Sequence, residues 1–487
     1  MKTGWSLAAV LLLLAACASP VRTSELPRID QNAGYRYAVL EQKAPKTIDK
    51  TVVILTFSGG GTRAAALADG ALRALAETPV KAGDARLPLA SQIDLVSSVS
   101  GGSVTAAYFA LGGTDGLGDL ETQFLHSDVM STLVWRTLLD PAQLAYPRID
   151  ILEGYLDEKV FHGKTYADLI AAEQPGRGRR PFVVLNAADM ASGSVFSFNQ
   201  DQFDLICADL AELKIADAVA ASAAFPVALS ALTIRNRAPC PAQRQATTTP
   251  GTGWIMTENG PVPRRLANDL GADTAQGVGY PAAQNLARFR RGTVALTYLN
   301  REGTKTYVQL LDGGIADNLG LTLPLTLLTS PSESPSFLNW ANTGKADKLL
   351  LLVVNARGQA ANDFGQSARP PGIFDTLLTT IGTPIDSTSY QLLGKIDQLV
   401  DGPFNPKSLV MVDFDFIADP GCRAHFQGMA TSWTLPGAEV DELIALGKAM
   451  VLQSPDYKAI VTALGGRVPE ANPSVEQICA PFKAKPS

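Results

Sequence analysis

The chain has 487 residues, of which 46% are hydrophobic and 18% are charged, and its formal net charge is −6. This length fits one large α/β domain or up to about three average domains, and the apolar share supplies a sizeable core. The net charge is negative and the most prominent basic run, residues 177–180, is short, so the composition argues against a nucleic-acid partner.

The first 16 residues have the pattern of a secretory signal. Lys2 is followed by an apolar run from Trp5 to Ala16, which is shorter than the roughly 20 residues that a membrane-spanning helix needs. The run ends in Leu-Ala-Ala before Cys17, and these residues resemble the lipobox of bacterial lipoproteins. The resemblance implies a signal peptide over residues 1–16 and a lipid on Cys17. An ordinary signal peptide followed by a chance cysteine is the alternative.

A polar, proline-containing segment comes next and predicts a tether over residues 17–47, between the bilayer and the folded domain. Because Ala18 rather than Asp follows the cysteine, the resemblance to bacterial lipoproteins implies the outer membrane, facing the periplasm. We therefore expect a cell-envelope protein that is held on the lipid bilayer through Cys17.

Four cysteines remain once Cys17 is assigned to lipidation, and an even number in an exported protein predicts two disulfides. Three pairings are possible, and four buried free thiols are the alternative. We favour the pairing of cysteines that are near in sequence, Cys207 with Cys240 and Cys422 with Cys479. No CxxC motif or His/Cys spacing predicts a metal site.

Continuous apolar and β-branched runs predict strands that are buried on both faces of a sheet. Segments with helical patterns lie between them, and this alternation predicts an α/β fold with a mainly parallel central sheet. The expected strands are residues 52–57, 93–99, 181–186, 307–311, 349–355 and 409–414. The expected helices are residues 64–77, 103–111, 376–400 and 438–453, together with a packed helix and exit loop over 216–232.

Residues 48–418 are expected to form the main domain, and residues 419–487 a helical extension. Within the main domain, residues 235–305 show little periodicity, and a stretch of this length predicts an insertion or a lid. Its aromatic residues, which suit an interface, are Trp254, Tyr280 and Phe289. We expect this segment to cover the functional site or to face a membrane, and a loop far from the site is the alternative.

Residues 58–63, Ser-Gly-Gly-Gly-Thr-Arg, link an expected strand to an expected helix. Three glycines let the backbone approach a ligand closely, and their N–H groups at a helix N-terminus can hold an anion. That anion could be a phosphate or the oxyanion of acyl transfer. The GxxxxGK[ST] pattern of a nucleotide-binding loop is not found in the chain.

A second strand-to-helix junction reads Ser98-Val99-Ser100-Gly101-Gly102. The nucleophile elbow G-x-S-x-G requires small residues on both sides of the serine because the turn is sharp. Here Ser98, which is also small, takes the place of the first glycine, so Ser100 is a candidate nucleophile.

Asp312 follows an expected strand and precedes two glycines, Gly313 and Gly314. An aspartate at a strand end next to glycines can face a site with little steric cover. By itself, however, this pattern equally fits a plain turn in which Asp serves local hydrogen bonding.

The three motifs together, in this order, resemble the patatin-like phospholipase family, with its G-G-G-x-R loop, G-x-S-x-G elbow and D-G-G/A turn. Residues 220–226, Ala-Ala-Ser-Ala-Ala-Phe-Pro, look like the A-S-x-x-x-P block of that family, and Asp317-Asn318 lies where the family often has Asn. The resemblance covers about residues 50–330. It implies a three-layer α/β/α fold and a serine acyl hydrolase that acts on the acyl esters of (phospho)lipids.

The resemblance also implies the role of each site residue. Ser100 would be the nucleophile and Asp312 the general base, without a metal or cofactor. The oxyanion hole would consist of the N–H groups of Gly59, Gly60 and Gly61. Arg63 would steady the loop or contact a phosphate. Because an ordinary Asp has a pKa near ~3.9, this mechanism needs a site that raises the pKa of Asp312.

Two alternatives remain open at this point. The order Ser100, Asp312, His425 also fits the Ser–acid–His triad of an α/β-hydrolase esterase. The second alternative is a non-catalytic envelope lipoprotein that binds lipid or a partner protein on a hydrolase fold.

Overall fold

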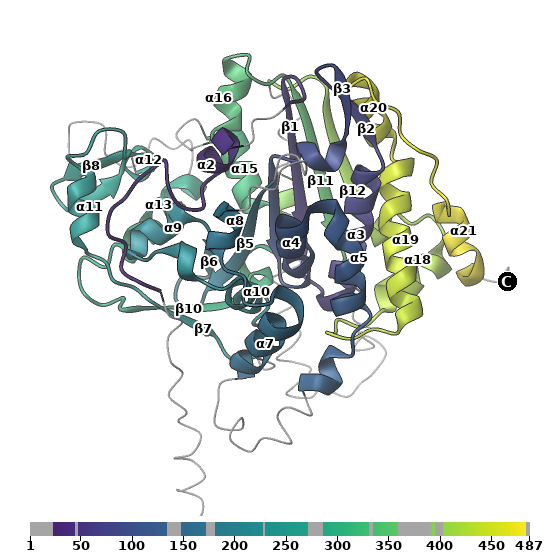
Figure 1. Cartoon of the computed structure of the whole chain (residues 1–487), viewed down its shortest axis with the longest axis horizontal. Coiled ribbons are helices and arrows are strands. Elements are labelled where there is room, and N and C mark those ends of the chain that lie inside the picture. The colour runs from purple at the N-terminus through teal and green to yellow at the C-terminus, as the bar shows by residue number, and fades with distance from the viewer. Residues whose placement is uncertain are drawn as a thin grey trace, which may run out of the picture.

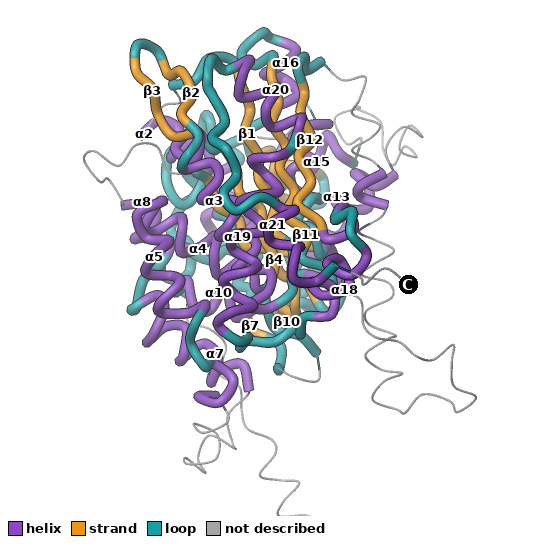
Figure 2. Tube along the Cα trace, turned by 90° about the vertical axis from the view of Figure 1, so that its right-hand side faces the viewer, coloured by secondary structure: helices purple, strands orange, loops and turns teal. Residues whose placement is uncertain are grey.

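The computed structural model describes residues 23–43, 47–133, 148–171, 181–226, 229–270, 286–330, 335–358, 389, 391–394 and 403–483. Its described part is built on one eight-stranded sheet with helices on both faces (Figure 1, Figure 2). Most neighbouring strands run parallel, so the predicted α/β fold with a mainly parallel central sheet is confirmed.

The sheet follows a non-sequential strand order, in which the first strand of the chain lies near the middle. From one edge to the other the strands are β12 (Lys407–Asp413), β11 (Lys348–Asn355), β1 (Thr51–Phe57), β4 (Leu95–Val99), β5 (Phe182–Asp189), β10 (Tyr307–Asp312) and β7 (Leu232–Arg235). β6 (Ser194–Ser197) pairs with β5 off this path. Two hairpins lie outside the sheet, β2 (Pro79–Ala82) with β3 (Ala85–Pro88), and β8 (Trp254–Thr257) with β9 (Gly260–Pro263).

The first five strands of this order are parallel, and β10, β7 and β6 are antiparallel to their neighbours. Every residue of β1 and β4 is buried, which is why these segments read as continuous apolar or small-residue runs. Because parallel strands end at one edge of a sheet, the turns after β1 and β4 lie side by side, with Phe57 opposite Ser98.

The helices have the following bounds. The first half contains α2 (Tyr37–Lys43), α3 (Gly61–Ala76), α4 (Gly101–Gly112), α5 (Leu117–Leu120), α7 (Arg148–Leu156), α8 (Tyr166–Ala171), α9 (Gln200–Phe203) and α10 (Ile215–Ser222). The second half contains α11 (Pro241–Ala246), α12 (Arg264–Asp269), α13 (Leu286–Tyr298), α14 (Gly314–Asp317), α15 (Thr322–Thr329), α16 (Phe337–Asn342), α18 (Pro420–Gly428), α19 (Gly437–Gln453), α20 (Pro455–Ala463) and α21 (Val475–Cys479). In Figure 2, α4 and α5 lie on one side of the strands, and α13 and α15 lie on the other.

The C-terminal helix α19 packs directly on α3, which follows the glycine-rich loop (Figure 1). Glycines make this close crossing possible. A Cβ on Gly70 would lie 2.1 Å from the carbonyl oxygen of Ile444, and a Cβ on Gly447 would lie 2.3 Å from that of Leu67. The segment predicted as a C-terminal extension therefore covers the helix that leads out of the site.

The N-terminal segment 23–43 is packed on the domain, so the prediction of a tether over residues 17–47 is wrong for this part. Tyr35 and Tyr37 are buried, and the Arg36 guanidinium pairs with the buried carboxylate of Asp204 at 2.7 Å. These anchors are aromatic and charged residues whose partners lie far away in sequence, and a polar composition by itself does not reveal them.

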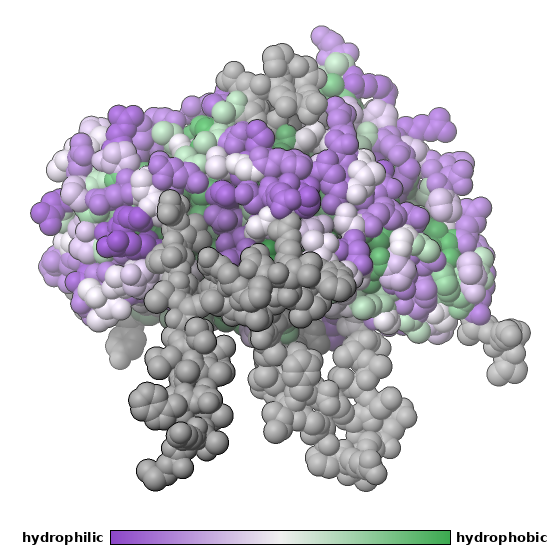
Figure 3. All heavy atoms as spheres, turned by 60° about the horizontal axis from the view of Figure 1, so that its bottom comes forward, coloured by the Kyte–Doolittle hydropathy of each residue, from purple (hydrophilic) through white to green (hydrophobic). Residues whose placement is uncertain are grey.

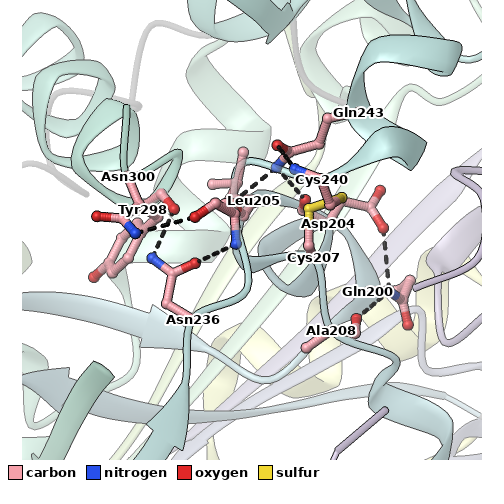
Figure 4. The surroundings of a disulfide bond; sticks show 11 residues. Gln200, Asp204, Leu205, Cys207, Ala208, Asn236, Cys240, Gln243, Tyr298 and Asn300 are labelled. Atoms are coloured by element: carbon pink, nitrogen blue, oxygen red, sulfur yellow. Dashed lines mark hydrogen bonds between the residues drawn. A yellow bond between two sulfur atoms is a disulfide. The ribbon is translucent and has the colours of Figure 1, made fainter. Parts of the chain in front are cut away.

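Both predicted disulfides are present in the predicted pairing, Cys207–Cys240 and Cys422–Cys479. Figure 4 shows the first, which joins the turn after α9 to the start of α11. Beside it, the Gln243 side chain donates to the carbonyl oxygens of Asp204 and Leu205 at 3.0 and 3.1 Å.

The predicted insertion, residues 235–305, is only partly described, and its described part is folded. It contains α11, the β8–β9 hairpin, α12 and α13, and Figure 1 shows α11 and β8 at the outer side of the molecule, beside α9 and α12. Trp254 is buried, so the expectation that it is an interfacial aromatic is wrong. Phe289 is half-buried, and Tyr280 lies outside the described residues.

The packed helix and exit loop predicted over residues 216–232 correspond to α10, which ends at Ser222, and to the described non-helical residues after it. The carbonyl oxygens of Ser222 and Ala224 accept hydrogen bonds from the N–H groups of Gly313 and Asp312. The predicted helix 376–400 lies mostly outside the described residues. Within the described part of the chain, no helix is both long and apolar enough to span a membrane. The face in Figure 3 is mainly hydrophilic where it is described, with smaller apolar areas toward its right side.

Candidate functional site

Ser100 occupies a strained turn between β4 and α4. Its φ is 50° and its ψ is −124°, a conformation that a non-glycine residue rarely adopts and that costs of order 1–3 kcal/mol. The following glycines are required by close contacts. A Cβ on Gly101 would lie 2.0 Å from the carbonyl oxygen of Gly61, and a Cβ on Gly102 would lie 2.6 Å from that of Ser58. The turn after β4 is thus pressed against the glycine-rich loop after β1.

Asp312 reaches the same place from the other side of β5. β5 lies between β4 and β10, with Asn186 opposite Val99 and Ala187 opposite Asp312. Because β10 runs antiparallel to β5, its end meets the end of β4 across these two residues. The Ser100 hydroxyl lies near enough to the Asp312 carboxyl to lower its pKa as a hydrogen-bond donor.

The environment of Asp312 favours a base that works near neutral pH. Burial raises the pKa of its carboxyl to about 6, against the opposing effect of the hydrogen bonds from the Gly314 N–H and the Ser100 hydroxyl. The Gly314 bond measures 2.8 Å and fixes one carboxylate oxygen. The pKa shift that the sequence analysis required is therefore present, and its main cause is burial.

The glycine-rich loop faces Ser100. A Cβ on Gly59 would lie 3.2 Å from the Ser100 Cβ and 2.6 Å from the Asn318 Oδ1, so only glycine allows this approach. Gly60 and Gly61 have φ of 143° and 60°, which glycine alone adopts readily. The close approach and the positive φ angles of this loop thus require the glycines.

The three N–H groups assigned to the oxyanion hole are not equivalent. The N–H of Gly59 donates to the backbone carbonyl of Asn318 at 3.2 Å, so this group already has an acceptor within the chain. The N–H groups of Gly60 and Gly61 donate to no acceptor among the described residues. The sequence could not distinguish the three N–H groups, because the acceptor of the Gly59 N–H is Asn318, which follows α14 and is far away in sequence.

Arg63 steadies the loop. Its guanidinium donates to the carbonyl oxygens of Ala356 and Met429 and to the Thr431 hydroxyl, the first and last at 2.9 Å. Burial lowers its pKa to about 10. Of the two roles considered from the sequence, loop support and phosphate contact, the structure supports the first, because carbonyl and hydroxyl oxygens of the chain occupy the guanidinium.

Ser98 stands where the G-x-S-x-G motif has its first glycine, and hydrogen bonds hold its side chain. Its hydroxyl lies 3.1 Å from that of Ser103, and Ser103 lies 3.0 Å from the hydroxyl of Ser222. Ser222 belongs to the block of residues 220–226, to which sequence analysis gave no specific role. Asn186, a polar residue in the middle of the buried strand β5, was missed altogether, although such a residue in a buried strand is itself a signal.

His425 does not take the place that a catalytic triad requires. Its Nε2 lies 2.8 Å from a carboxylate oxygen of Glu442, and its ring stacks on Phe482 with 3.7 Å between centroids. A triad histidine would instead lie between Ser100 and Asp312.

Within the described part of the chain, one group of side chains has metal-ligating types close together. Glu121, His126 and Asp441 have ligand atoms within 4.8 Å of one another, between residues Glu121–Leu125 and α19. His126 pairs with Asp441 at 3.2 Å and Glu121 pairs with Arg73 at 2.7 Å, so ion pairing accounts for the cluster.

The fold and the turn at Ser100 define an α/β protein with a strained serine between a strand and a helix. Residues 55–248 match the family model of patatin-like phospholipases, which confirms the resemblance over that segment. Among solved structures, human GIVD cytosolic phospholipase A2 is similar, with 12% identity, a TM-score of 0.39 and coverage of 88% of this chain and 62% of that chain. The same enzyme in complex with methyl gamma-linolenyl fluorophosphonate is also similar, with 14% identity and a TM-score of 0.37. This match covers 88% of this chain and 62% of that chain. The chain thus spans about 62% of the length of these structures. No curated protein matches the chain in sequence.

Proposed function

We propose that this chain is a serine-dependent lipid acyl hydrolase that uses a Ser100–Asp312 dyad. The observation that carries the proposal is the buried Asp312 carboxyl beside the Ser100 hydroxyl, with burial raising its pKa to about 6. The match of residues 55–248 to patatin-like phospholipases supports acyl esters of lipids as the substrate class.

The reaction would proceed in two steps. Ser100 Oγ attacks the ester carbonyl carbon while Asp312 accepts the hydroxyl proton, and the N–H groups of Gly60 and Gly61 stabilise the oxyanion. The alcohol leaves with the proton from Asp312, and an acyl-enzyme remains. A water molecule then attacks the acyl group while Asp312 takes one of its protons. The bond to Ser100 Oγ breaks, Asp312 returns the proton to this oxygen, and the fatty acid is released.

The proposal is tested by labelling the purified protein with a fluorophosphonate and by lipid profiling on a panel of acyl esters. We expect the label on Ser100 and fatty-acid release by the wild type, with neither in Ser100→Ala. Heat-denatured wild type is the control for non-specific labelling. Labelling of Ser100→Ala equal to that of the wild type, or a folded wild type inert on every ester of the panel, would refute the proposal.

We further propose that Cys17 carries a lipid and holds the protein on the outer membrane, facing the periplasm. Cys17 lies outside the described residues, and the support is the Leu-Ala-Ala-Cys pattern at its position. The folded chain is already fixed at Thr23, which accepts a hydrogen bond from Arg237 at 2.9 Å. Six residues at ~3.3–3.6 Å each span at most ~20 Å, so the anchor would keep the domain close to the bilayer.

We expect Cys17→Ser to abolish lipid attachment and to release the protein from the membrane, because one serine side chain offers no thiol for the acyl glycerol group. Metabolic labelling with palmitate and fractionation of cell envelopes measure both effects. The control is a substitution of Cys240 and Cys207 together, which removes a disulfide and leaves Cys17 intact. Equal palmitate in Cys17→Ser and wild type would contradict the anchor.

A further inference from the structure

The last residue of α10, Ser222, lies directly behind the nucleophile and is fully buried. Its hydroxyl accepts a hydrogen bond from the Ser100 N–H at 2.8 Å. The same hydroxyl donates to the carbonyl oxygen of Asn186 at 2.6 Å. The backbone N–H of the strained residue is therefore held by a side chain from another element.

The hydroxyl groups of Ser98, Ser103 and Ser222 form a chain of hydrogen bonds behind Ser100. Because each hydroxyl has one proton, the donor and acceptor at Ser222 can be assigned. Ser222 has one hydroxyl proton, and the carbonyl oxygen of Asn186 can only accept it. Ser103, which lies 3.0 Å from Ser222, must then donate to it. The Ser98 hydroxyl can donate to Ser103 at 3.1 Å or to the carbonyl oxygen of Val184 at 3.4 Å. Each buried hydroxyl has its proton used, so the chain is a fixed support for the turn.

The backbone of the same segment holds the base. The carbonyl oxygen of Ser222 accepts the Gly313 N–H at 3.0 Å, and that of Ala224 accepts the Asp312 N–H at 2.9 Å. One short stretch at the end of α10 thus bonds to the backbone of both Ser100 and Asp312, which belong to different strands on either side of β5.

We propose that Ser222 is a positioning residue that sets the distance between Ser100 and Asp312. This inference rests on the proposed function of that pair. Without the Ser222 hydroxyl, the buried Ser100 N–H loses its acceptor, and the turn no longer has the bond that opposes relaxation of its positive φ. The Ser100 hydroxyl then moves relative to the Asp312 carboxylate.

The test compares Ser222→Ala with Thr105→Val. Thr105 is a matched control, since its buried hydroxyl lies on the same helix as Ser103 and donates to Ala65 at 2.8 Å, without contact to the chain behind Ser100. We expect Ser222→Ala to lower kcat by about 10- to 100-fold with little change in KM, and to speed amide hydrogen exchange at Ser100. Thr105→Val should leave both quantities unchanged.

Ser222→Cys provides a second variant if Ser222→Ala does not fold, because a thiol has similar size and keeps a weak donor and acceptor. Its kcat should lie between those of wild type and Ser222→Ala. The exchange rate at Ser100 needs no turnover, so it decides the positioning role even if the wild type proves inactive and the proposed function fails. A folded Ser222→Ala with wild-type kcat and exchange, or an equal loss in Thr105→Val, would overturn the inference.

Discussion

Asp312→Asn should abolish turnover about as completely as Ser100→Ala, with each substitution lowering kcat by at least about 10⁴-fold. In the proposed mechanism the Asp312 carboxylate accepts the proton of the Ser100 hydroxyl. An amide of the same shape keeps the hydrogen bond from the Gly314 N–H but cannot take up that proton. Because both groups act in one step, the double variant should be no worse than either single one. Steady-state kinetics on a soluble ester measures all three.

Loss of fold would not explain this result. Burial penalises the charged carboxyl of Asp312 and raises its pKa to about 6, so the ionised residue lowers folding stability, increasingly as the pH rises from the unfolded pKa to about 6 and constantly above it. A neutral Asn avoids that cost, and the melting temperature of Asp312→Asn at pH 7 should not fall below that of the wild type.

The pH profile and His425 supply the controls for the dyad. Since protonated Asp312 cannot accept a proton, kcat/KM should decrease as the pH falls through about 6. His425→Ala should keep the catalytic rate, because His425 pairs with Glu442. A well-folded His425→Ala without activity would favour the triad hydrolase instead.

Gly101→Ala should lower kcat by about 100-fold or more and reduce the melting temperature. The added Cβ would lie 2.0 Å from the carbonyl oxygen of Gly61 and within 2.7 Å of its backbone nitrogen and carbon, none of which can rotate away. The turn after β4 must then separate from the glycine-rich loop, and Ser100 loses its position relative to the N–H groups of Gly60 and Gly61. A misplacement of about 1 Å is enough for a loss of this size.

Gly112→Ala is the matched control, since it lies in the same helix and an added Cβ there would meet no atom within 4 Å. Its activity and melting temperature should match those of the wild type or, because alanine favours helices, show a slightly higher melting temperature. The explanation fails if Gly101→Ala is folded and turns over at the wild-type rate.

Local chemistry in the sequence was enough to predict the core strands and the turns of the candidate site. Strands buried on both faces need continuous apolar runs, and close approach of two turns needs glycine, so both leave marks that can be read residue by residue. The pairing of Cys207 with Cys240 and of Cys422 with Cys479 was also predictable, through nearness in sequence.

The partners of the polar groups were decided by the tertiary structure. Arg63 contacts residues 356 and 429–431, the Gly59 N–H contacts Asn318, and Ser222 holds the backbone of Ser100. These contacts depend on the sheet order, in which β5 lies between β4 and β10, and on α19 packing against α3. A hydrogen bond needs only a donor and an acceptor, and many residues offer them. Only the folded arrangement of distant segments selects which ones meet.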